Sequence, residues 1–448
     1  MTTNITIRTT TGSDVETFVG DIFDNLAGGI FTNTSITGIG ANGDRAVLQG
    51  SFSYSGTPSL NTLTGGTVTK MTLVDNPGSI LYSTATLPSL DAATVVDTLL
   101  NGTRAQFYAL LGPIKFNGND GADIFAGGTQ SDSISGGAGN DILSGKGGND
   151  TIEGGAGADN MRGDAGIDTL SYSDSGARVI VSLTGRAKGG DATGDSFSGF
   201  ESLTGSDFND KLTGNASANT LSGGKGNDIL RGAAGADVLI GGGGKDTADY
   251  TGSNAGVTVN LATNAAVGGH ANGDSFDGIE NILGSTFADS LTGDIAVNIL
   301  RGGGGNDTLF GGANDDRLDG NAGNDRLIGG SGHDTLFGRA GGDIFVLSNT
   351  AASSDRIKDY VVGTDMLEVD ASVFRGGLSA AADLDAAQVE VNTTGLASTA
   401  DVRFILNSDT GQLYYDINGS IGDDTGSRLV AVLQGTLAGF SNTDFDIV

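Results

Sequence analysis

The sequence predicts a mainly β protein, in which a parallel β-roll lies between a small N-terminal α+β domain and a β-rich C-terminal cap. Three observations predict the roll, a solenoid of short parallel strands. Sixteen aspartates recur at nine-residue intervals between residues 123 and 343. Glycine stands five and usually two residues before each acid, and an apolar residue stands two after it. A disordered Gly- and Asp-rich linker is the alternative, but such linkers lack a periodic apolar position.

The acid positions form three runs, and asparagine fills one step of the second run and one of the third. In order, they are Asp123, Asp132, Asp141, Asp150, Asp159, Asp168, Asp210, Asn219, Asp228, Asp237, Asp246, Asp289, Asn298, Asp307, Asp316, Asp325, Asp334 and Asp343. The segment GGAGNDILS, residues 136–144, shows one complete unit. Two units make a coil of 18 residues, so turns stack on both sides of the solenoid and apolar residues such as Leu143 point into its core.

The chemistry of these turns predicts a metal. Glycine permits the tight turn and the positive φ that leave backbone carbonyls facing inward, and the carboxylate that ends the turn adds a charged oxygen. Calcium takes roughly six to eight such oxygen ligands. We therefore expect all eighteen positions to be calcium ligands. Each ion should lie between one turn and the turn eighteen residues further on, which gives roughly a dozen ions.

Over roughly residues 118–347 the nonapeptide resembles the calcium-binding repeat of RTX (repeats-in-toxin) proteins. The resemblance implies a calcium-loaded parallel β-roll. It also implies export by type I (ABC) secretion machinery that reads an uncleaved C-terminal signal. The final residues LAGFSNTDFDIV, with Asp444 and Asp446 before Ile447 and Val448, are similar to such signals. We therefore expect an extracellular protein, either secreted or attached to the cell surface.

Two similar inserts, near residues 171–200 and 249–279, separate the three runs. Residues 169–183 align with residues 247–261, and both segments end in an alternating apolar pattern. Glu201 and Glu280 lie nine residues before the next acid, so the register resumes there with glutamate. The inserts are interpreted as wider coils of the same solenoid, and the alternative is that they divide it into separate rolls.

The flanking regions lack the repeat. In residues 1–117, alternating stretches at 47–56, 67–74 and 79–87 predict antiparallel strands. Residues 89–102 predict a helix with Ser89 as its N-cap, and residues 103–112 a second short helix. Residues 348–448 form the predicted cap, and the segments 353–369 and 410–420 resemble the domain that ends serralysin-type RTX proteins. The protease signature HExxH is absent.

Composition excludes several partners. The net charge of −31 lacks the basic footprint of a nucleic-acid-binding protein, and no apolar run is long enough for membrane insertion. The absence of cysteine excludes a disulfide scaffold and a thiol enzyme. A dozen calcium ions would reduce the charge to about −7. Without calcium the chain should repel itself and stay unfolded, so we expect folding to begin outside the cell.

The sequence favours a protein that is not an enzyme. Its two histidines, His270 and His333, both lie outside residues 1–117, so a Ser-His-Asp triad or a histidine zinc site is impossible there. The favoured function is a surface-layer, matrix or adhesion protein that self-associates or binds cell-surface polysaccharide. A carbohydrate- or host-surface-binding module and a secreted enzyme with its activity in residues 1–117 remain as alternatives.

Overall fold

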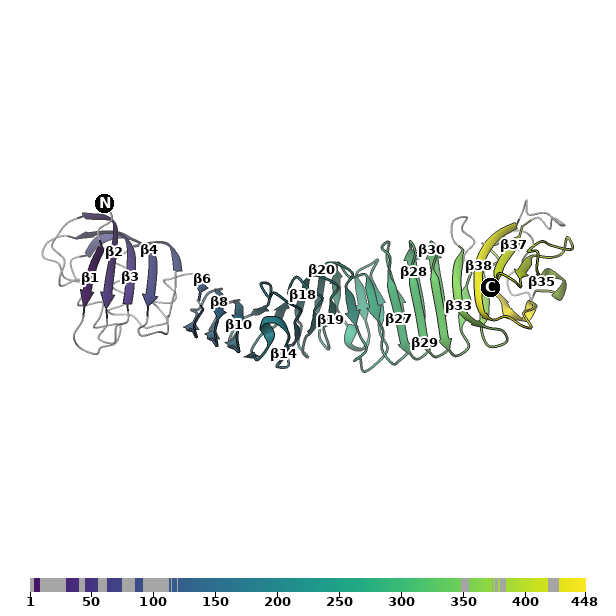
Figure 1. The fold of residues 1–448 in the computed structure, drawn as a ribbon, viewed down its shortest axis with the longest axis horizontal. Coiled ribbons are helices and arrows are strands. Elements are labelled where there is room, and N and C mark those ends of the chain that lie inside the picture. Colours follow the sequence, from purple (N-terminus) through teal and green to yellow (C-terminus); the bar gives the residue numbers. More distant parts are fainter. Residues whose placement is uncertain are drawn as a thin grey trace. The chain divides into compact units, whose positions relative to one another are not determined.

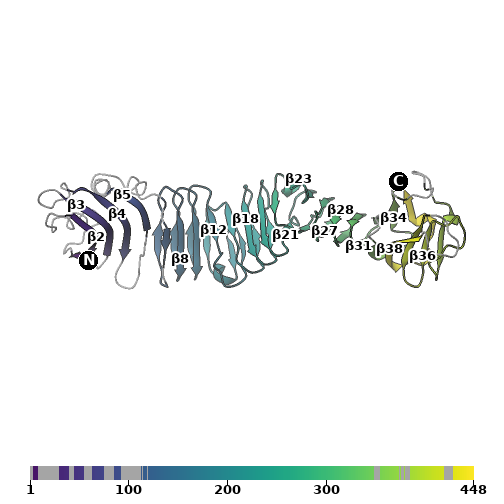
Figure 2. The ribbon, with the colours of Figure 1, turned by 90° about the horizontal axis from the view of Figure 1, so that it is seen from above.

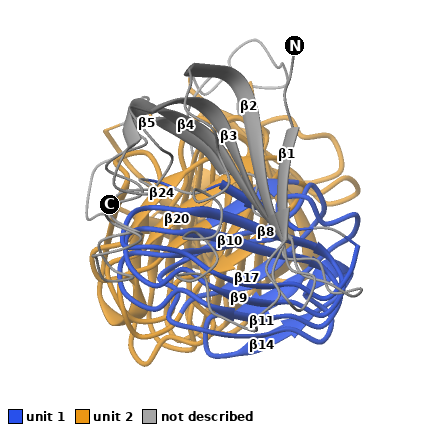
Figure 3. Cartoon of the chain, turned by 90° about the vertical axis from the view of Figure 1, so that its left-hand side faces the viewer, with its two compact units in different colours: residues 1–214, 222–225 blue, residues 215–221, 226–448 orange. Residues whose placement is uncertain are grey.

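The computed structural model describes residues 113, 115–118, 120–347, 354–372, 374, 378, 384–417 and 427–448, and the backbone of five strands that precede them. It divides into two compact units (Figure 3). Unit 1 holds residues 1–214 and 222–225, and unit 2 holds residues 215–221 and 226–448. The boundary falls within β18 (Thr220–Lys225). Among the described residues, no helix combines the length and apolar character needed to span a membrane.

The five N-terminal strands form one sheet in the order β1-β2-β3-β4-β5. They are β1 (Asn4–Arg8), β2 (Ile30–Ile39), β3 (Arg45–Tyr54), β4 (Leu63–Val74) and β5 (Ala85–Asp91). β1 pairs with β2 in parallel, and the other neighbours are antiparallel. The predicted N-cap at Ser89 is wrong, because β5 runs through it and pairs with β4 as far as Asp91. Residues 92–112, which hold the rest of both predicted helices, lie outside the described residues.

In unit 1 the repeats form short parallel strands on two faces, and Figure 2 looks onto the face that contains β8 and β12. One face has β6 (Lys115–Asn117), β8 (Ser133–Ala138), β10 (Thr151–Ala156), β12 (Thr169–Ser171) and β16 (Ser202–Thr204), and the other has β7 (Ile124–Ala126), β9 (Ile142–Ser144), β11 (Asn160–Arg162) and β15 (Ser196–Ser198). Paired residues such as Ile134 and Ile152 are eighteen positions apart, which confirms the predicted coil.

Unit 2 repeats this plan (Figure 1). One face has β19 (Ile229–Arg231), β21 (Thr247–Asp249), β25 (Asn281–Leu283), β27 (Ile299–Gly304), β29 (Arg317–Ala322) and β31 (Thr335–Ala340), and the other has β22 (Thr258–Asn260), β26 (Ser290–Thr292), β28 (Thr308–Ala313), β30 (Arg326–Ser331) and β32 (Ile344–Val346). The apolar side chain of each repeat, such as Leu309 or Leu318, is fully buried, and burying a leucine contributes about 1.5–3 kcal/mol.

The parallel ladder runs across each insert, as the wider-coil interpretation predicts. In the first insert, β12 pairs with β16 and β11 with β15. In the second, β20 (Val238–Gly243) pairs with β24 (Ser275–Asp277), and β21 with β25. Each insert also starts a new sheet with a hairpin, formed by β13 (Ile180–Ser182) and β14 (Arg186–Lys188), or by β22 and β23 (Ala265–Val267). β13 then pairs with β17 (Lys211–Thr213), and β22 with β26.

The ladder also continues past the last repeat. β33 (Asp355–Val361) and β34 (Met366–Val369) pair in parallel with β31 and β32. β38 (Ser427–Thr436) and β39 (Phe445–Ile447) add one further coil. The remaining cap strands are β35 (Val389–Asn392), β36 (Phe404–Asn407) and β37 (Gln412–Asp416). The residues expected to form the secretion signal thus lie in and around β39, the last strand of the ladder.

Candidate metal centre

The repeat acids form two ladders of hydrogen bonds, one along each side of the solenoid. The backbone N–H of Asp123 donates to Oδ1 of Asp141 at 2.7 Å, and that of Asp307 donates to Oδ1 of Asp325 at 2.9 Å. The same bond, always spanning eighteen residues, recurs from Asp132, Asp141, Asp150, Asn219, Asp228, Asp289, Asn298, Asp316 and Asp325. One carboxylate oxygen of each acceptor is therefore used by the backbone.

Each insert supplies acids that continue these ladders. Glu201 accepts from the N–H of Asp168, and Glu280 from that of Asp246, which confirms the prediction that glutamate resumes the register. Four further acids were missed by the sequence analysis. They are Asp195, Asp274, Asp355 and Asp365, which accept from Asp159, Asp237, Asp334 and Asp343. Each of these acids lies more than eighteen residues after its donor. The GDSF motif that recurs in the two inserts contains Asp195 and Asp274 and was a sequence signal for these two.

The second carboxylate oxygen of many repeat acids is buried without a hydrogen-bond partner. This holds for Oδ2 of Asp141, Asp150, Asp159, Asp168, Asp237, Asp246, Asp307, Asp316, Asp325 and Asp334. Their residues are at most 2 % exposed. A buried, unpaired carboxylate is strongly unfavourable unless it gains a cation or a proton. Accordingly, burial raises the pKa of Asp307 and of Asp316 to about 7.

The glycine five residues before each acid forms one wall of an oxygen-lined cradle. A Cβ added to Gly136 would lie 2.6 Å from the carbonyl oxygen of Gly154 and would collide with Oδ2 of Asp141. Gly302 repeats this arrangement with the Gly320 carbonyl and Asp307. The same point on successive turns therefore brings together a carboxylate oxygen and a carbonyl oxygen from the turn eighteen residues on.

The same oxygen-lined cradle is also present where an insert interrupts the repeats. A Cβ on Gly163 would collide with the Gly199 carbonyl, and one on Gly241 with the Gly278 carbonyl. Gly199 and Gly278 both belong to the wider coils, so each insert returns a carbonyl to the position that an ordinary coil would supply.

This donor set fits calcium. Among the described residues, no three acidic or histidine side chains converge as a metal cluster. The donors are instead a carboxylate from one turn and backbone carbonyls from neighbouring turns. Hard oxygen donors of this kind are typical of calcium, whereas structural zinc sites use cysteine and histidine. The repeat acids would hold each ion. The ion would supply the positive charge that balances the second carboxylate oxygen, Oδ2, which is called the outer oxygen below.

The structure places all eighteen predicted ligands in buried turns, but it does not make them alike. At Asp132, Asp210, Asn219, Asp289 and Asn298 the outer side-chain oxygen accepts a hydrogen bond from the backbone N–H four residues earlier. These five turns satisfy the oxygen without a metal. The expectation that all eighteen positions are calcium ligands did not distinguish these five turns from the others.

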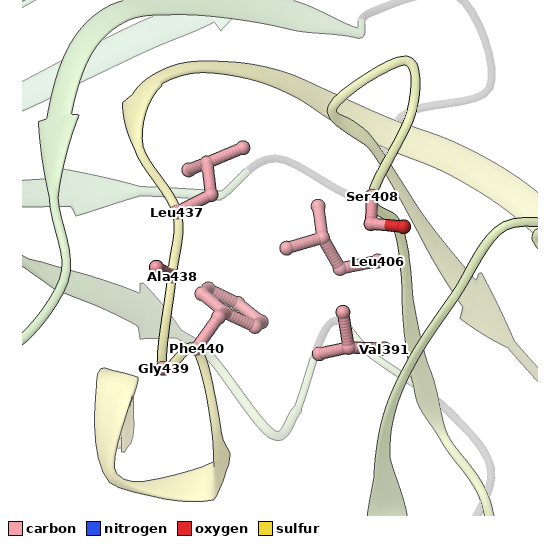
Figure 4. A pocket seen from close by; sticks show the side chains of 7 residues that line it. All are labelled: Val391, Leu406, Ser408, Leu437, Ala438, Gly439 and Phe440. Carbon is pink, nitrogen blue, oxygen red and sulfur yellow. The ribbon is translucent and has the colours of Figure 1, made fainter.

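The two histidines make different contacts. The ring of His333 is exposed and lies 3.3 Å from the Ser354 carbonyl. The backbone N–H of His270 donates to the hydroxyl of Ser253. A cavity of about 310 Å³ in the cap lies between Val391 and Leu406 on one side and residues 437–440 on the other (Figure 4). No titratable side chain lines this cavity, so it offers no group for acid–base chemistry.

Comparison with known proteins agrees with this geometry. The family described as RTX calcium-binding nonapeptide repeat (4 copies) matches residues 117–152, 135–170, 195–230, 213–248, 274–309 and 310–345. The matches cover the three runs and stop before the cap, so the resemblance of the cap to serralysin-type domains stays a prediction. A search of curated proteins found no match.

Proposed function

Because the centre of this chain is an array of RTX calcium-binding nonapeptide repeats folded as a parallel β-solenoid, we propose a secreted protein that folds when it meets extracellular calcium. We further propose that it is not an enzyme and that it acts in a surface layer, an extracellular matrix or adhesion. The observation that carries the proposal is the row of buried carboxylate oxygens without partners, in a chain of net charge −31.

The free energy of calcium binding favours folding outside the cell over folding in the cytosol. An ion that binds the folded roll but not the unfolded chain stabilises the fold by about 1.4 kcal/mol per site when its concentration is about tenfold above the dissociation constant. Extracellular calcium modules have dissociation constants near ~0.1–1 mM, so millimolar calcium stabilises many turns together. At cytosolic calcium the gain is close to zero. The chain would then remain largely unfolded, the state in which we propose that type I machinery exports it.

The role in assembly rests on the N-terminal sheet. In the order of its described strands, β1 and β5 stand at the two ends, and an edge strand is a template for pairing with another chain. We propose that residues 1–117 mediate self-association or attachment to cell-surface polysaccharide. The lack of histidine and cysteine in this segment supports a binding role over catalysis.

Sedimentation velocity and negative-stain electron microscopy of the full chain test this proposal, with calcium, with magnesium or with EGTA. Calcium should give a compact particle that associates further as protein concentration rises, and EGTA should give an expanded monomer. Magnesium should not replace calcium, because it prefers a smaller, strictly octahedral site. Compact monomers at every concentration in calcium would exclude assembly, and a compact particle in EGTA would exclude the calcium switch.

A further inference from the structure

Most turns in the described part of the solenoid are of two kinds. In open turns, the residue two before the acid has a positive φ, such as Gly305 (φ 103°) before Asp307 and Gly323 (φ 135°) before Asp325. Of the ten described turns with an unpartnered acid oxygen, the one at Asp316 has Asn314 in place of glycine, with φ 70°. The outer oxygen of the acid then faces the cradle, as described above for ten of these turns.

In closed turns the chain itself satisfies the acid. Ser285 donates its backbone N–H to Oδ2 of Asp289 and its hydroxyl to Oδ1 at 2.8 Å. The same hydroxyl accepts the N–H of Phe287 at 3.0 Å. Phe287 stands where open turns have glycine, so the positive φ of an open turn would be strained there. Ser206, Phe208 and Asp210 repeat this arrangement in the first half of the array.

In two closed turns asparagine replaces the acid, and at Asn298 the side-chain amide nitrogen donates to neighbouring oxygens. Nδ2 of Asn298 donates to the carbonyl of Glu280, eighteen residues earlier, at 2.7 Å. It also donates to Oδ1 of Asp294 at 3.3 Å. The outer oxygen of Asn298 accepts the N–H of Asp294 at 2.8 Å. A neutral donor therefore links successive coils where an open turn presents an unpaired carboxylate oxygen.

Four of the five closed turns are clustered in the sequence, and the fifth, at Asp132, lies by itself in the first run. The turns ending at Asp210 and Asn219 directly follow the first insert, and those ending at Asp289 and Asn298 directly follow the second. In each insert, a tyrosine hydroxyl also donates a hydrogen bond to the acid that continues the ladder. The hydroxyl of Tyr172 donates to Oδ2 of Asp195 at 2.9 Å.

The second insert repeats this closure and adds a core of its own. The hydroxyl of Tyr250 donates to Oδ2 of Asp274 at 2.8 Å. Val257, Val259 and Ala271 are buried in this insert, as Val179, Val181 and Ala192 are in the first. Each insert and the two turns after it thus combine apolar packing with side-chain oxygens that accept hydrogen bonds from the chain itself.

We infer that calcium binds only at the open turns, and that residues 172–219 and 250–298 are two segments that keep their fold when calcium is withdrawn. This inference rests on the proposed calcium-dependent folding. The closed segments hold the register of the chain, and the open turns between and beyond them fold onto these segments as ions bind.

Hydrogen exchange followed by mass spectrometry on the full chain tests the inference, with calcium and after chelation by EGTA. Calcium at a hundred times its dissociation constant slows exchange about 100-fold at each turn whose opening releases the ion. We expect this loss of protection on chelation in residues 136–168 and 300–343. Residues 206–219 and 285–298 should keep their protection.

The outcomes separate the two proposals. Equal loss in open and closed segments would overturn the inference and leave calcium-dependent folding intact. No change anywhere on chelation would overturn both. The double variant Ser285→Gly with Phe287→Gly converts a closed turn to the open sequence. It should make residues 285–298 calcium-sensitive, whereas Thr286→Ala, at an exposed position of the same turn, should not. If the double variant keeps its protection in EGTA, the assignment of the closure to Ser285 and Phe287 is wrong.

Discussion

The backbone amide of Asp307 donates a 2.9 Å hydrogen bond to Oδ1 of Asp325, while Oδ2 of Asp325 is buried without a hydrogen-bond partner. One carboxylate therefore has two tasks: it joins one coil to the next through the backbone, and it presents an unpaired charge to the cradle. The first task needs only an acceptor oxygen. The second makes the fold depend on a cation.

Replacing Asp325 with asparagine separates these tasks. Asp325→Asn keeps an acceptor for the Asp307 amide but removes the charge, so we expect about a tenfold higher calcium concentration at the midpoint of folding, or about 1.4 kcal/mol. In EGTA the same change should be neutral or stabilising, because the uncompensated charge is gone. Asp277→Asn, at an exposed residue, makes the same charge change outside the ladder. Equal effects of the two variants would contradict the account.

Two glycines of one turn test the cradle. A Cβ on Gly241 would collide with the Gly278 carbonyl, whereas one on Gly243 would meet open space. Gly241→Ala should raise the calcium requirement for folding by at least about tenfold, since the side chain fills the position between the two oxygens. Gly243→Ala should leave it unchanged. Calcium titration followed by intrinsic fluorescence or circular dichroism measures both, and a Gly241→Ala protein with wild-type affinity would exclude the cradle as the ion site.

The tyrosines of the inserts should contribute to stability whether or not calcium is present. Tyr250→Phe leaves Oδ2 of buried Asp274 without its donor, which costs about 1–3 kcal/mol. Urea unfolding in calcium should show this loss, and hydrogen exchange in EGTA should show faster exchange in residues 250–298. Tyr414→Phe, at a half-buried tyrosine of the cap, serves as the control. An unchanged urea midpoint for Tyr250→Phe would show that the hydroxyl does not close the insert.

Acid should partly replace calcium. Burial raises the pKa of Asp307 and Asp316 to about 7 and that of Asp141 to about 6, from an ordinary value of 3.8. The folded calcium-free roll therefore holds protons more tightly than the unfolded chain does. This contribution is complete below about pH 4 and is lost as the pH rises through about 6–7.

Size-exclusion chromatography in EGTA tests this pH dependence. The calcium-free chain should be more compact at about pH 5 than at about pH 8. In calcium the order should reverse, because protons compete with the ion for the same oxygens. A calcium-free chain of constant size across this range would contradict the raised pKa values.

The sequence predicted the coil and its core because both repeat with a fixed period. Nine-residue spacing places Leu143 and Leu309 in the core, and it places Asp141 and Asp307 in stacked turns. These are consequences of local chain geometry, so no knowledge of distant contacts was needed.

The nine-residue period could not predict ladder residues that lie outside that period. Asp195 and Asp274 join the ladders from 36 and 37 residues beyond their donors, because an insert intervenes. The closed turns could not be predicted for a different reason: the acids and glycines define the repeat, whereas closure depends on the residues between them. Serine, asparagine or aspartate four before the acid, with no glycine two before it, is the signal at Ser206, Asn215, Ser285 and Asp294.

The helix start that was expected at Ser89 is wrong because strand pairing overrode local propensity. Val68 pairs with Leu90 in the register of β4 and β5, and Thr67 pairs with Asp91. Propensity is a weak guide wherever a sheet edge can accept the segment.

Far-UV circular dichroism of the full chain during a calcium titration from EGTA tests the central claim most directly. If the buried carboxylates of the open turns require divalent cations, the β-sheet signal in EGTA is well below that of the calcium-loaded chain. It rises cooperatively as calcium approaches millimolar concentration, while magnesium fails to raise it. A spectrum in EGTA that already equals the calcium-loaded one would contradict the account, because the unpaired oxygens of Asp141 to Asp334 would then be tolerated without an ion.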